Sequence, residues 1–235
     1  MDKLNRDELF SLAINLDLPS LLKFCRTNKY FSEKICSRDE IWSYRLSKDF
    51  PDYKNLNVTN KSKKELYQLL YGLVEVKNKL KRKETIYELY DLRKLNLFDN
   101  GLEEIPSSLG NLLNLQELNL DVNKLTAIPP SLGNLVKLRQ LSLNNNNLTE
   151  IPESLGNLIN LEQLYLAQNN LVKIPASLGN LVNLQQLYLT DNKLTQIPES
   201  LGNLINLQRL SLQGNKLAEQ QKIKIQQKFG NIAKV

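Results

Sequence analysis

Apolar residues recur at a fixed interval in the second half of the chain. The first leucine of each unit stands 23 positions after the one before it, at Leu92, Leu115, Leu138, Leu161, Leu184 and Leu207. Each unit follows the pattern LxxLxLxxNxLxxIPxSLGNLxN. Residues two apart lie on the same face of a strand, so Leu141 and Leu143 are expected to face inward while Ser142 and Asn144 face outward. The pattern therefore predicts one short strand in each unit.

The rest of the unit predicts a turn and a return path. An asparagine follows each predicted strand, and its amide can pair with turn backbone groups that stacking would otherwise bury unpaired. These asparagines are Asn100, Asn123, Asn146, Asn169, Asn192 and Asn215. Proline then stops the local structure, and SLGNL allows a single helical turn in which glycine tolerates a positive φ. A lone unit cannot bury its apolar face, so successive units must stack.

This pattern resembles the leucine-rich repeat, in which each unit adds one strand to a parallel sheet. The resemblance implies an α/β fold, a leucine-rich-repeat solenoid over residues 92–217 preceded by an all-α helical module. After Leu217 the pattern fails, and residues 218–235 are expected to form a C-terminal cap in which Ile223, Phe229 and Ile232 cover the last unit. In leucine-rich-repeat proteins the strands line a concave face that binds partners.

The outward strand positions vary, whereas the rest of the unit hardly changes. Tyr165 and Tyr188 occupy the same position of adjacent units, and aromatic residues anchor many protein partners. The expected target-binding residues of the concave face are Phe98, Asp121, Arg139, Tyr165, Tyr188, Asp191 and Arg209. The alternative is a solvated sheet face without a ligand. Similar IPxSLGNL repeats occur in intracellular proteins that bind small GTPases and signalling proteins, so the resemblance implies a protein target.

Residues 1–50 lack the 23-residue period and carry apolar residues at helical intervals. Pro19 suits the first turn of a helix, and Asp39 is the expected cap of the helix that carries Trp42. The segment resembles the F-box in Leu16, Asp17, Pro19, Leu21, Leu22, Cys25, Arg26, Phe31 and Trp42. The resemblance implies a Skp-type adaptor as a partner, bound through Leu16, Leu18, Pro19, Leu21 and Leu22. The alternative is a small helical bundle that only caps the repeats.

Residues 51–91 are expected to form a helical connector and an N-terminal cap. In KSKKELYQLLYGL, one helical face carries Leu66, Leu69, Leu70 and Leu73. The following helix is expected to be basic, and near its end Ile86, Leu89 and Leu92 would cover the open edge of the first unit. An F-box-like module, a basic connector and 23-residue repeats together resemble proteins encoded by large DNA viruses and by amoeba-associated bacteria.

Composition narrows the function further. The chain has no histidine, which removes the commonest general base and metal ligand and excludes Ser-His and Cys-His triads. We expect no cofactor, no metal site and no catalysis. The formal net charge is +6 over 235 residues. The one dense basic run, Lys77 to Lys83, has no interleaved aromatic residues for stacking on bases, so a solvated helix face is favoured over nucleic-acid binding.

The N-terminal residues MDKLNRDELF carry charges where a signal peptide needs an apolar stretch, and the sequence contains no run of eighteen apolar residues. We therefore expect a protein without membrane association that lies in the cytoplasm, including that of a eukaryotic host cell. The two cysteines, Cys25 and Cys36, are too few for a disulfide framework and lack the spacing of zinc ligands. Free, mostly buried thiols are expected.

These features favour an interaction scaffold that serves as a substrate receptor of a cullin-RING ubiquitin ligase of the SCF type. The N-terminal module would bind the adaptor, and the repeats would hold a target nearby, which raises the effective concentration of the target's lysines. The rival hypothesis is an interaction module that binds a signalling protein without a ligase. A third hypothesis is that the chain is itself an enzyme, like the bacterial repeat proteins that act as ubiquitin ligases through a catalytic cysteine after the repeats. Here both cysteines precede the repeats, and the chain ends at Val235.

Overall fold

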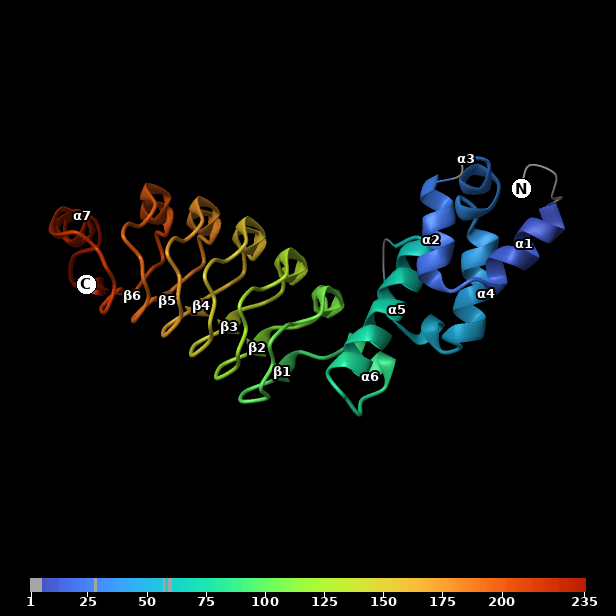
Figure 1. Ribbon diagram of the computed structural model, residues 1–235, viewed down its shortest axis with the longest axis horizontal. Helices are drawn as coiled ribbons and strands as arrows, with labels where there is room; N and C mark the ends of the chain where they lie inside the picture. Colours follow the sequence, from blue (N-terminus) through green and yellow to red (C-terminus); the bar gives the residue numbers. More distant parts are fainter. Residues whose placement is uncertain (1–5, 28, 57, 59–60) are drawn as a thin grey trace. The chain divides into compact units, whose positions relative to one another are not determined.

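The computed structural model describes residues 6–27, 29–56, 58 and 61–235. Contacts divide the chain into two compact units, residues 1–74 and residues 75–235, which we call the head and the repeat domain. In Figure 1 the head is a cluster of helices, and the repeat domain has parallel strands on one side and short helical turns on the other. The predicted fold class is confirmed. Residues 1–5 and 28 of the predicted N-terminal module, and residues 57 and 59–60 of the connector, lie outside the described residues.

The head consists of helices with short connections. Its elements are α1 (Arg6–Asn15), α2 (Leu18–Thr27), α3 (Lys29–Phe31), the π-helical turn η1 (Ser32–Cys36), α4 (Asp39–Asp49), the 3-10 turn η2 (Tyr53–Asn55) and the first part of α5 (Lys63–Lys79). Pro19 lies in the first turn of α2, as predicted. The Asp17 carboxylate accepts a 2.7 Å hydrogen bond from the backbone N–H of Ser20, which lowers the pKa of Asp17. The cap predicted at Asp39 is wrong, because Asp39 is the first helical residue of α4 and Arg38 precedes it without a capping side-chain bond.

Aromatic side chains pack the interior of the head. Trp42 is 1% exposed, and its indole N–H donates a 3.0 Å hydrogen bond to the backbone oxygen of Cys36. The Tyr67 ring packs against Trp42 and Phe50, with ring centroids 5.9 and 5.6 Å away. Its hydroxyl donates to Asp49 at 2.6 Å, and burial raises the pKa of Tyr67. The predicted apolar face of α5 is confirmed, since Leu66, Leu69, Leu70 and Leu73 are all buried.

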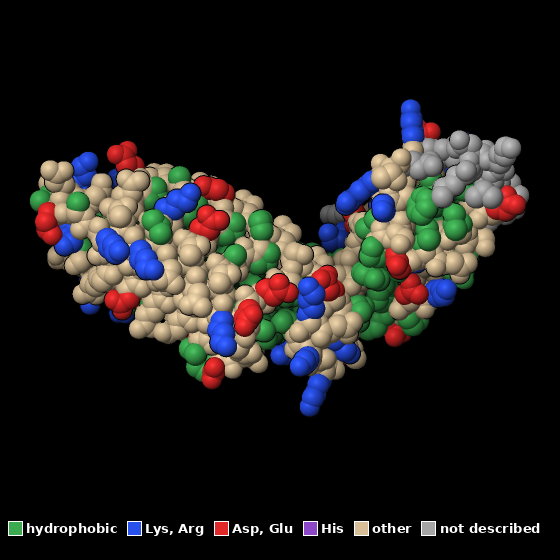
Figure 2. Space-filling view, viewed as in Figure 1, with side chains coloured by type: hydrophobic (Ala, Val, Ile, Leu, Met, Phe, Trp, Pro, Cys, Tyr) green, Lys and Arg blue, Asp and Glu red, His purple; other side chains and the backbone are tan. Residues whose placement is uncertain are grey.

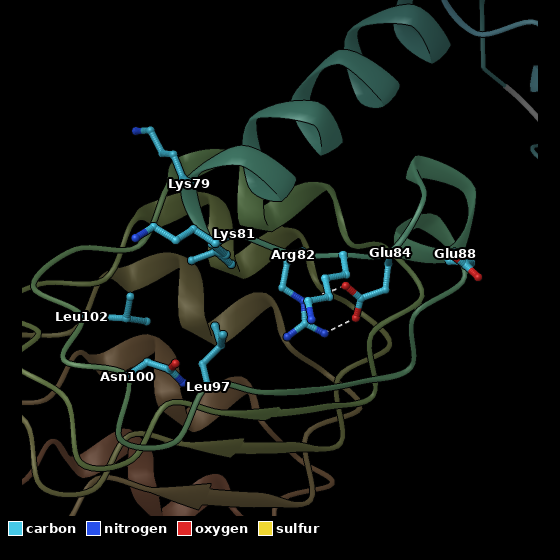
Figure 3. Close-up of a pocket in the computed structure, with 10 residues that line it drawn as sticks. Lys79, Lys81, Arg82, Glu84, Glu88, Leu97, Asn100 and Leu102 are labelled. Atoms are coloured by element: carbon cyan, nitrogen blue, oxygen red, sulfur yellow. Dashed lines mark hydrogen bonds and ion pairs between the residues drawn. The ribbon is translucent and has the colours of Figure 1, made fainter.

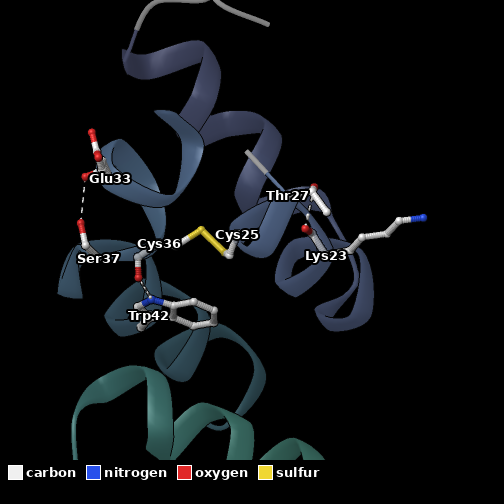
Figure 4. Close-up of a disulfide and its surroundings, with 7 residues drawn as sticks. All are labelled: Lys23, Cys25, Thr27, Glu33, Cys36, Ser37 and Trp42. Atoms are coloured by element: carbon white, nitrogen blue, oxygen red, sulfur yellow. Dashed lines mark hydrogen bonds between the residues drawn. A yellow bond between two sulfur atoms is a disulfide. The ribbon is translucent and has the colours of Figure 1, made fainter. Parts of the chain in front are cut away.

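Cys25 and Cys36 form a disulfide, so the expectation of free thiols is wrong. Helix α2 and the turn η1 bring their Cα atoms to 5.9 Å, a separation that suits this bond. Figure 4 shows the disulfide beside the indole of Trp42. No residue pattern predicted the pairing of the two cysteines, because it depends on how the helices fold together. Disulfides persist in oxidising compartments and are rare in reducing ones, so the redox state of this pair depends on the compartment in which the protein lies.

The repeat domain contains one parallel sheet of seven strands in sequence order. The strands are β1 (Lys94–Asn96), β2 (Glu117–Asn119), β3 (Gln140–Ser142), β4 (Gln163–Tyr165), β5 (Gln186–Tyr188), β6 (Arg209–Ser211) and β7 (Ala233–Lys234). Across the first six strands, residues 23 apart pair in register, as Tyr165 does with Tyr188. Leu141 and Leu143 are fully buried, which confirms the predicted inward face. Each 23-residue unit, called a coil below, therefore adds leucines to one continuous interior.

The turn asparagines join each coil to the coil before it. The Asn169 amide donates to the backbone oxygen of Leu143 at 2.9 Å and accepts from the backbone N–H of Leu148 at 3.0 Å. Asn123, Asn146, Asn192 and Asn215 make the same kinds of bond. Asn100, in the first coil, is exposed and donates to the oxygen of Phe98 in its own turn. The predicted pairing role is confirmed from the second coil onward.

A 3-10 turn carries each of the first five coils back along the side opposite the strands. These turns are η3 (Ser107–Asn111), η4 (Pro130–Asn134), η5 (Glu153–Asn157), η6 (Ala176–Asn180) and η7 (Glu199–Asn203). Their glycines do not adopt the positive φ that the sequence suggested. They are needed for close packing instead. A Cβ atom on Gly179 would stand 2.4 Å from the backbone oxygen of Ser200 in the next turn.

Positive φ angles occur at a different position of the coil, just after the strand. The residues there are Asp99, Val122, Asn145, Gln168, Asp191 and Gly214, with φ between 52° and 71°. Only the last of these is a glycine. Asparagine and aspartate adopt this left-handed conformation more readily than other side chains, whereas a β-branched valine at Val122 is strained there. Each of the strands β1 to β6 is therefore followed, three positions after its last residue, by a left-handed residue that turns the chain away from the sheet.

Both ends of the repeat domain are covered by the chain itself. At the C-terminus, α7 (Glu219–Phe229) and the 3-10 turn η8 (Gly230–Ile232) lead into β7. Ile225 is 2% exposed in this cap, whereas Ile223, which the sequence placed there, is 56% exposed. At the N-terminal end, α6 (Ile86–Tyr90) buries Leu89 completely. The expectation that the helix after α5 is basic is wrong, because that helix is α6, which contains no lysine or arginine, and Lys81 to Lys83 lie before it.

Candidate functional site

The strands form the inner, concave side of the solenoid. Neighbouring strands pack about 4.8 Å apart, whereas the bulkier helical turns need more room, so the coils spread on the turn side and curve toward the strands. Outward strand residues of equal position then form columns across the coils. One column contains Lys94, Glu117, Gln140, Gln163, Gln186 and Arg209, and the next contains Asn96, Asn119, Ser142, Tyr165, Tyr188 and Ser211. A third, beyond the strands, contains Phe98, Asp121, Asn144, Ala167, Thr190 and Gln213.

Two of the predicted residues, Tyr165 and Tyr188, stack on each other. Their ring centroids are 5.1 Å apart and their planes differ by 17°. The Tyr165 hydroxyl donates to the side-chain oxygen of Gln163 at 3.0 Å, and burial raises the pKa of Tyr165. Arg209 lies 3.5 Å from the Tyr188 hydroxyl, and that hydrogen bond raises the pKa of Arg209. The structure therefore brings the tyrosines and Arg209 together into one half-buried aromatic platform with polar groups at its edge.

The carboxylate of Asp121 is hydrogen bonded within the repeat domain. It accepts hydrogen bonds from the Ser142 hydroxyl at 2.7 Å and from the backbone N–H of Asn144 at 2.6 Å. The Asn144 side chain in turn accepts from the backbone N–H of Ala167 at 2.8 Å. These bonds link adjacent coils along the edge of the sheet. They leave Asp121 with less capacity to pair with a partner than the sequence suggested.

The remaining predicted residues lie apart from the tyrosine pair. Phe98 is 51% exposed in the first coil, and Arg139 pairs with Glu162 at 3.2 Å in the adjacent coil. Asp191 lies at the left-handed turn after β5, where its carboxylate covers Gly214. Figure 2 shows Lys and Arg side chains interspersed with Asp and Glu side chains on the visible face of the repeat domain. The surface is mixed in charge, of the type that protein interfaces use at their rims.

The predicted adaptor residues on the head divide into buried and accessible ones. Leu18 and Leu21 are 6% and 0% exposed, so they belong to the interior of the head. Leu16 and Leu22 are half-buried and Pro19 is exposed. A partner could therefore touch Leu16, Pro19 and Leu22 without the head unfolding.

Sequence reasoning missed two features of the repeat domain. Gln163 and Gln186 contact the tyrosine hydroxyls, and the 23-residue period could have found them because they stand two positions before each tyrosine. The second feature is a cleft beside the first coil, lined by residues between Lys79 and Leu102. No periodic signal predicts it, because it depends on where α5 ends.

The aromatic and polar side chains of the concave face form a surface that is suited to binding. Among the described residues, no group of three or more metal-ligating side chains comes together. Within the same residues, no helix has the length and apolar character that a membrane span requires. The tyrosine platform can stack, exclude water and hydrogen bond, which are the functions of a recognition surface.

Leucine-rich repeats are the class of structure that this fold defines, and the comparisons agree. A family model described as a leucine-rich repeat matches residues 90–148, and one described as a leucine-rich repeat region matches residues 130–234. A solved leucine-rich-repeat protein of Leptospira interrogans is similar, with a TM-score of 0.61 and 36% sequence identity. The match covers 63% of this chain and 38% of the Leptospira protein, so the chain spans well under half of that relative. No curated protein matches the chain significantly.

Proposed function

We propose that this chain is a non-enzymatic interaction protein whose concave face binds a protein partner. The observation that carries the proposal is the stacked pair Tyr165 and Tyr188, held half-buried on a face whose outward residues differ from coil to coil. Aromatic side chains that are already ordered lose little conformational entropy when a partner covers them. They therefore provide a favourable anchor.

The surroundings of the pair support a protein ligand. Gln163 and Arg209 provide hydrogen-bond donors and acceptors at its edge, and Arg139 and Glu162 add an exposed ion pair nearby in sequence. Tyrosine and arginine are enriched among the residues that dominate binding energy at protein interfaces. A mixed rim of this kind favours a partner with both apolar and polar groups.

The test compares full-length variants as affinity baits in cell extract, with bound proteins measured by quantitative mass spectrometry. The double substitution Tyr165→Ala with Tyr188→Ala should reduce recovery of a partner by about tenfold or more. Ile159→Ala with Val182→Ala is the matched control, because both side chains are exposed on the return segments of the coils. The proposal is abandoned if no protein depends on the tyrosines, or if the control loses the same proteins.

We propose, as the more specific function, that the head binds a Skp-type adaptor and makes the chain a substrate receptor of a cullin-RING ubiquitin ligase. The helical composition of the head and the accessible Leu16, Pro19 and Leu22 support this proposal. Leu18 and Leu21 would then act by shaping α2 rather than by contacting the adaptor. Catalysis would belong to the bound ligase.

The adaptor proposal is tested by retention of purified Skp-type adaptor on full-length protein, with and without a reductant. Pro19→Glu with Leu22→Glu should abolish retention, whereas Ser47→Glu with Asn55→Glu, which add the same charge at exposed sites of the head, should not. If the unmodified chain retains no adaptor in either redox state, the rival function remains, an interaction module that binds a signalling protein without a ligase.

A further inference from the structure

An open cleft of about 900 Å³ lies beside the first coil of the repeat domain. In Figure 3, Lys79, Lys81 and Arg82 line one side of this cleft, and Leu97, Asn100 and Leu102 line the other. Lys83 completes the basic side. The cleft is thus basic where α5 ends and partly apolar where the first coil begins. It is separate in sequence from the tyrosine platform.

The end of α5 explains why cations gather here. Lys81 adopts a left-handed φ of 49°, and the backbone N–H of Arg82 donates to the oxygen of Lys77 at 2.9 Å, which closes the helix as a C-terminal cap. The chain reverses at this cap, so residues on both sides of it face the same cleft. A run of lysines that would otherwise spread around a helix is concentrated on one wall.

The acidic side chains nearby are already engaged. Glu84 pairs with Arg82 through two contacts, and this pairing lowers the pKa of Glu84. The Glu88 carboxylate accepts a 2.7 Å hydrogen bond from the backbone N–H of Thr85 in the capping box of α6. Lys81 and Lys83 are exposed and form no ion pair with any residue that the structure describes. Lys79 pairs with Glu75 at 3.4 Å, so the uncompensated positive charge of this wall comes from Lys81 and Lys83.

The opposite wall contains Asn100, the first of the turn asparagines that otherwise join each coil to the coil before it. From the second coil onward, each turn asparagine accepts from a backbone N–H of the preceding coil and donates to a backbone oxygen there, as Asn123 does with Leu102 and Leu97. No coil precedes Asn100. Its side-chain oxygen accepts no hydrogen bond from the residues that the structure describes, although its amide nitrogen donates to Phe98. A polypeptide backbone in the cleft could make the missing bonds.

We propose that this cleft binds an acidic peptide segment of a partner protein. The carboxylates of the segment pair with Lys81 and Lys83, its backbone bonds to Asn100, and an apolar side chain contacts the half-buried Leu102. The charge complementarity and the unfilled asparagine select this occupant over a neutral peptide. The site is independent of the function proposed for the concave face.

The test uses a short fluorescein-labelled peptide of glutamate, leucine and glycine, with binding to the full chain measured by fluorescence anisotropy. Lys81→Glu with Lys83→Glu should weaken binding by about tenfold or more, because charge reversal replaces attraction by repulsion. Lys193→Glu with Lys216→Glu changes the net charge equally at exposed, distant sites and should have little effect. Asn100→Ala should weaken binding by about threefold, which corresponds to one lost hydrogen bond.

Three results would overturn the proposal. The first is equal loss of binding in both double lysine variants, and the second is equal binding of a peptide with glutamine in place of glutamate. The third is that oligothymidine binds as tightly as the acidic peptide and that Lys81→Glu with Lys83→Glu abolishes its binding. The cleft would then be a general polyanion site. Tyr165→Ala with Tyr188→Ala should leave peptide binding unchanged, so failure here is distinguishable from failure at the concave face.

Discussion

At the residue scale, identical amino acids have different roles because their neighbours differ. Asn169 and Asn100 occupy the same repeat position, yet Asn169 is 7% exposed and joins two coils, whereas Asn100 is exposed and bonds within its own turn. The sequence predicted the pairing role from the repeated asparagine alone. It gave no sign that the first copy lacks a preceding coil to bind.

This difference predicts unequal costs for the same substitution. Asn169→Ala should lower the free energy of unfolding by about 1–3 kcal/mol, because the backbone N–H of Leu148 would be buried without its acceptor. Asn100→Ala should cost less than about 0.5 kcal/mol. Urea unfolding followed by circular dichroism measures both. Equal costs would mean that the asparagine bonds do not join the coils.

Val122 is the one β-branched residue at the left-handed position of the coils. Val122→Asn should raise the free energy of unfolding by about 1 kcal/mol, because asparagine adopts this conformation at lower cost. Val172→Asn is the control, since Val172 is similarly exposed but has no positive φ. The free energy of unfolding is measured by thermal denaturation. An equal change in both variants would show that the backbone at Val122 is not strained.

At the element scale, the contact between successive 3-10 turns limits what the repeat can contain. The Ser200 hydroxyl donates to the oxygen of Ala176 at 2.7 Å, and Gly179 lies directly against Ser200. Gly179→Ala should therefore cost about 1–3 kcal/mol of stability through overpacking. Asn180→Ala, an exposed neighbour in the same turn, should be nearly neutral. Chemical denaturation that finds Gly179→Ala neutral would show that the turns can separate freely.

The disulfide is the element-scale constraint of the head. Cross-linking residues 11 positions apart restricts the unfolded chain, and Cys25→Ser with Cys36→Ser should lower head stability by about 2–4 kcal/mol. The chain has one tryptophan, Trp42, and its indole is hydrogen bonded to Cys36, so its fluorescence reports on this unit. If reduction leaves the tryptophan unfolding curve unchanged, the disulfide is not present in the folded protein.

The sequence predicted the elements in which a residue pattern repeats. It did not predict features that form where two different elements meet. The 23-residue period was sufficient for the strands and the inward leucines, because every coil reports the same geometry. It did not reveal β7, because Ala233 stands 23 positions after Leu210 and pairs with it, but an alanine replaces the leucine of the pattern there. The Cys25–Cys36 bond and the cleft at Lys81 depend on tertiary contacts, which no periodic pattern records. On the concave face, the period located Tyr165 and Tyr188 but not the internal bonds that engage Asp121.

At the scale of the whole molecule, the chain combines a rigid repeated scaffold with a helical head. The interior of the coils is built from nearly identical residues, so differences between coils are confined to outward positions. Those positions hold the tyrosine platform. The platform stays partly exposed, because the caps cover the two ends of the repeat domain and not the strand side of the fourth and fifth coils. The central claim is that a partner binds on the strand side of the solenoid, at this platform.

Photo-crosslinking tests this claim most directly. A benzophenone amino acid at position 165 places the reactive group on the strand side of the fourth coil, and one at position 159 places the same group on the return segment of the third coil. On irradiation in extract, position 165 should give a discrete crosslinked protein that disappears when Tyr188→Ala is also present, and position 159 should not. A crosslink from position 159 but not from position 165 would contradict the account.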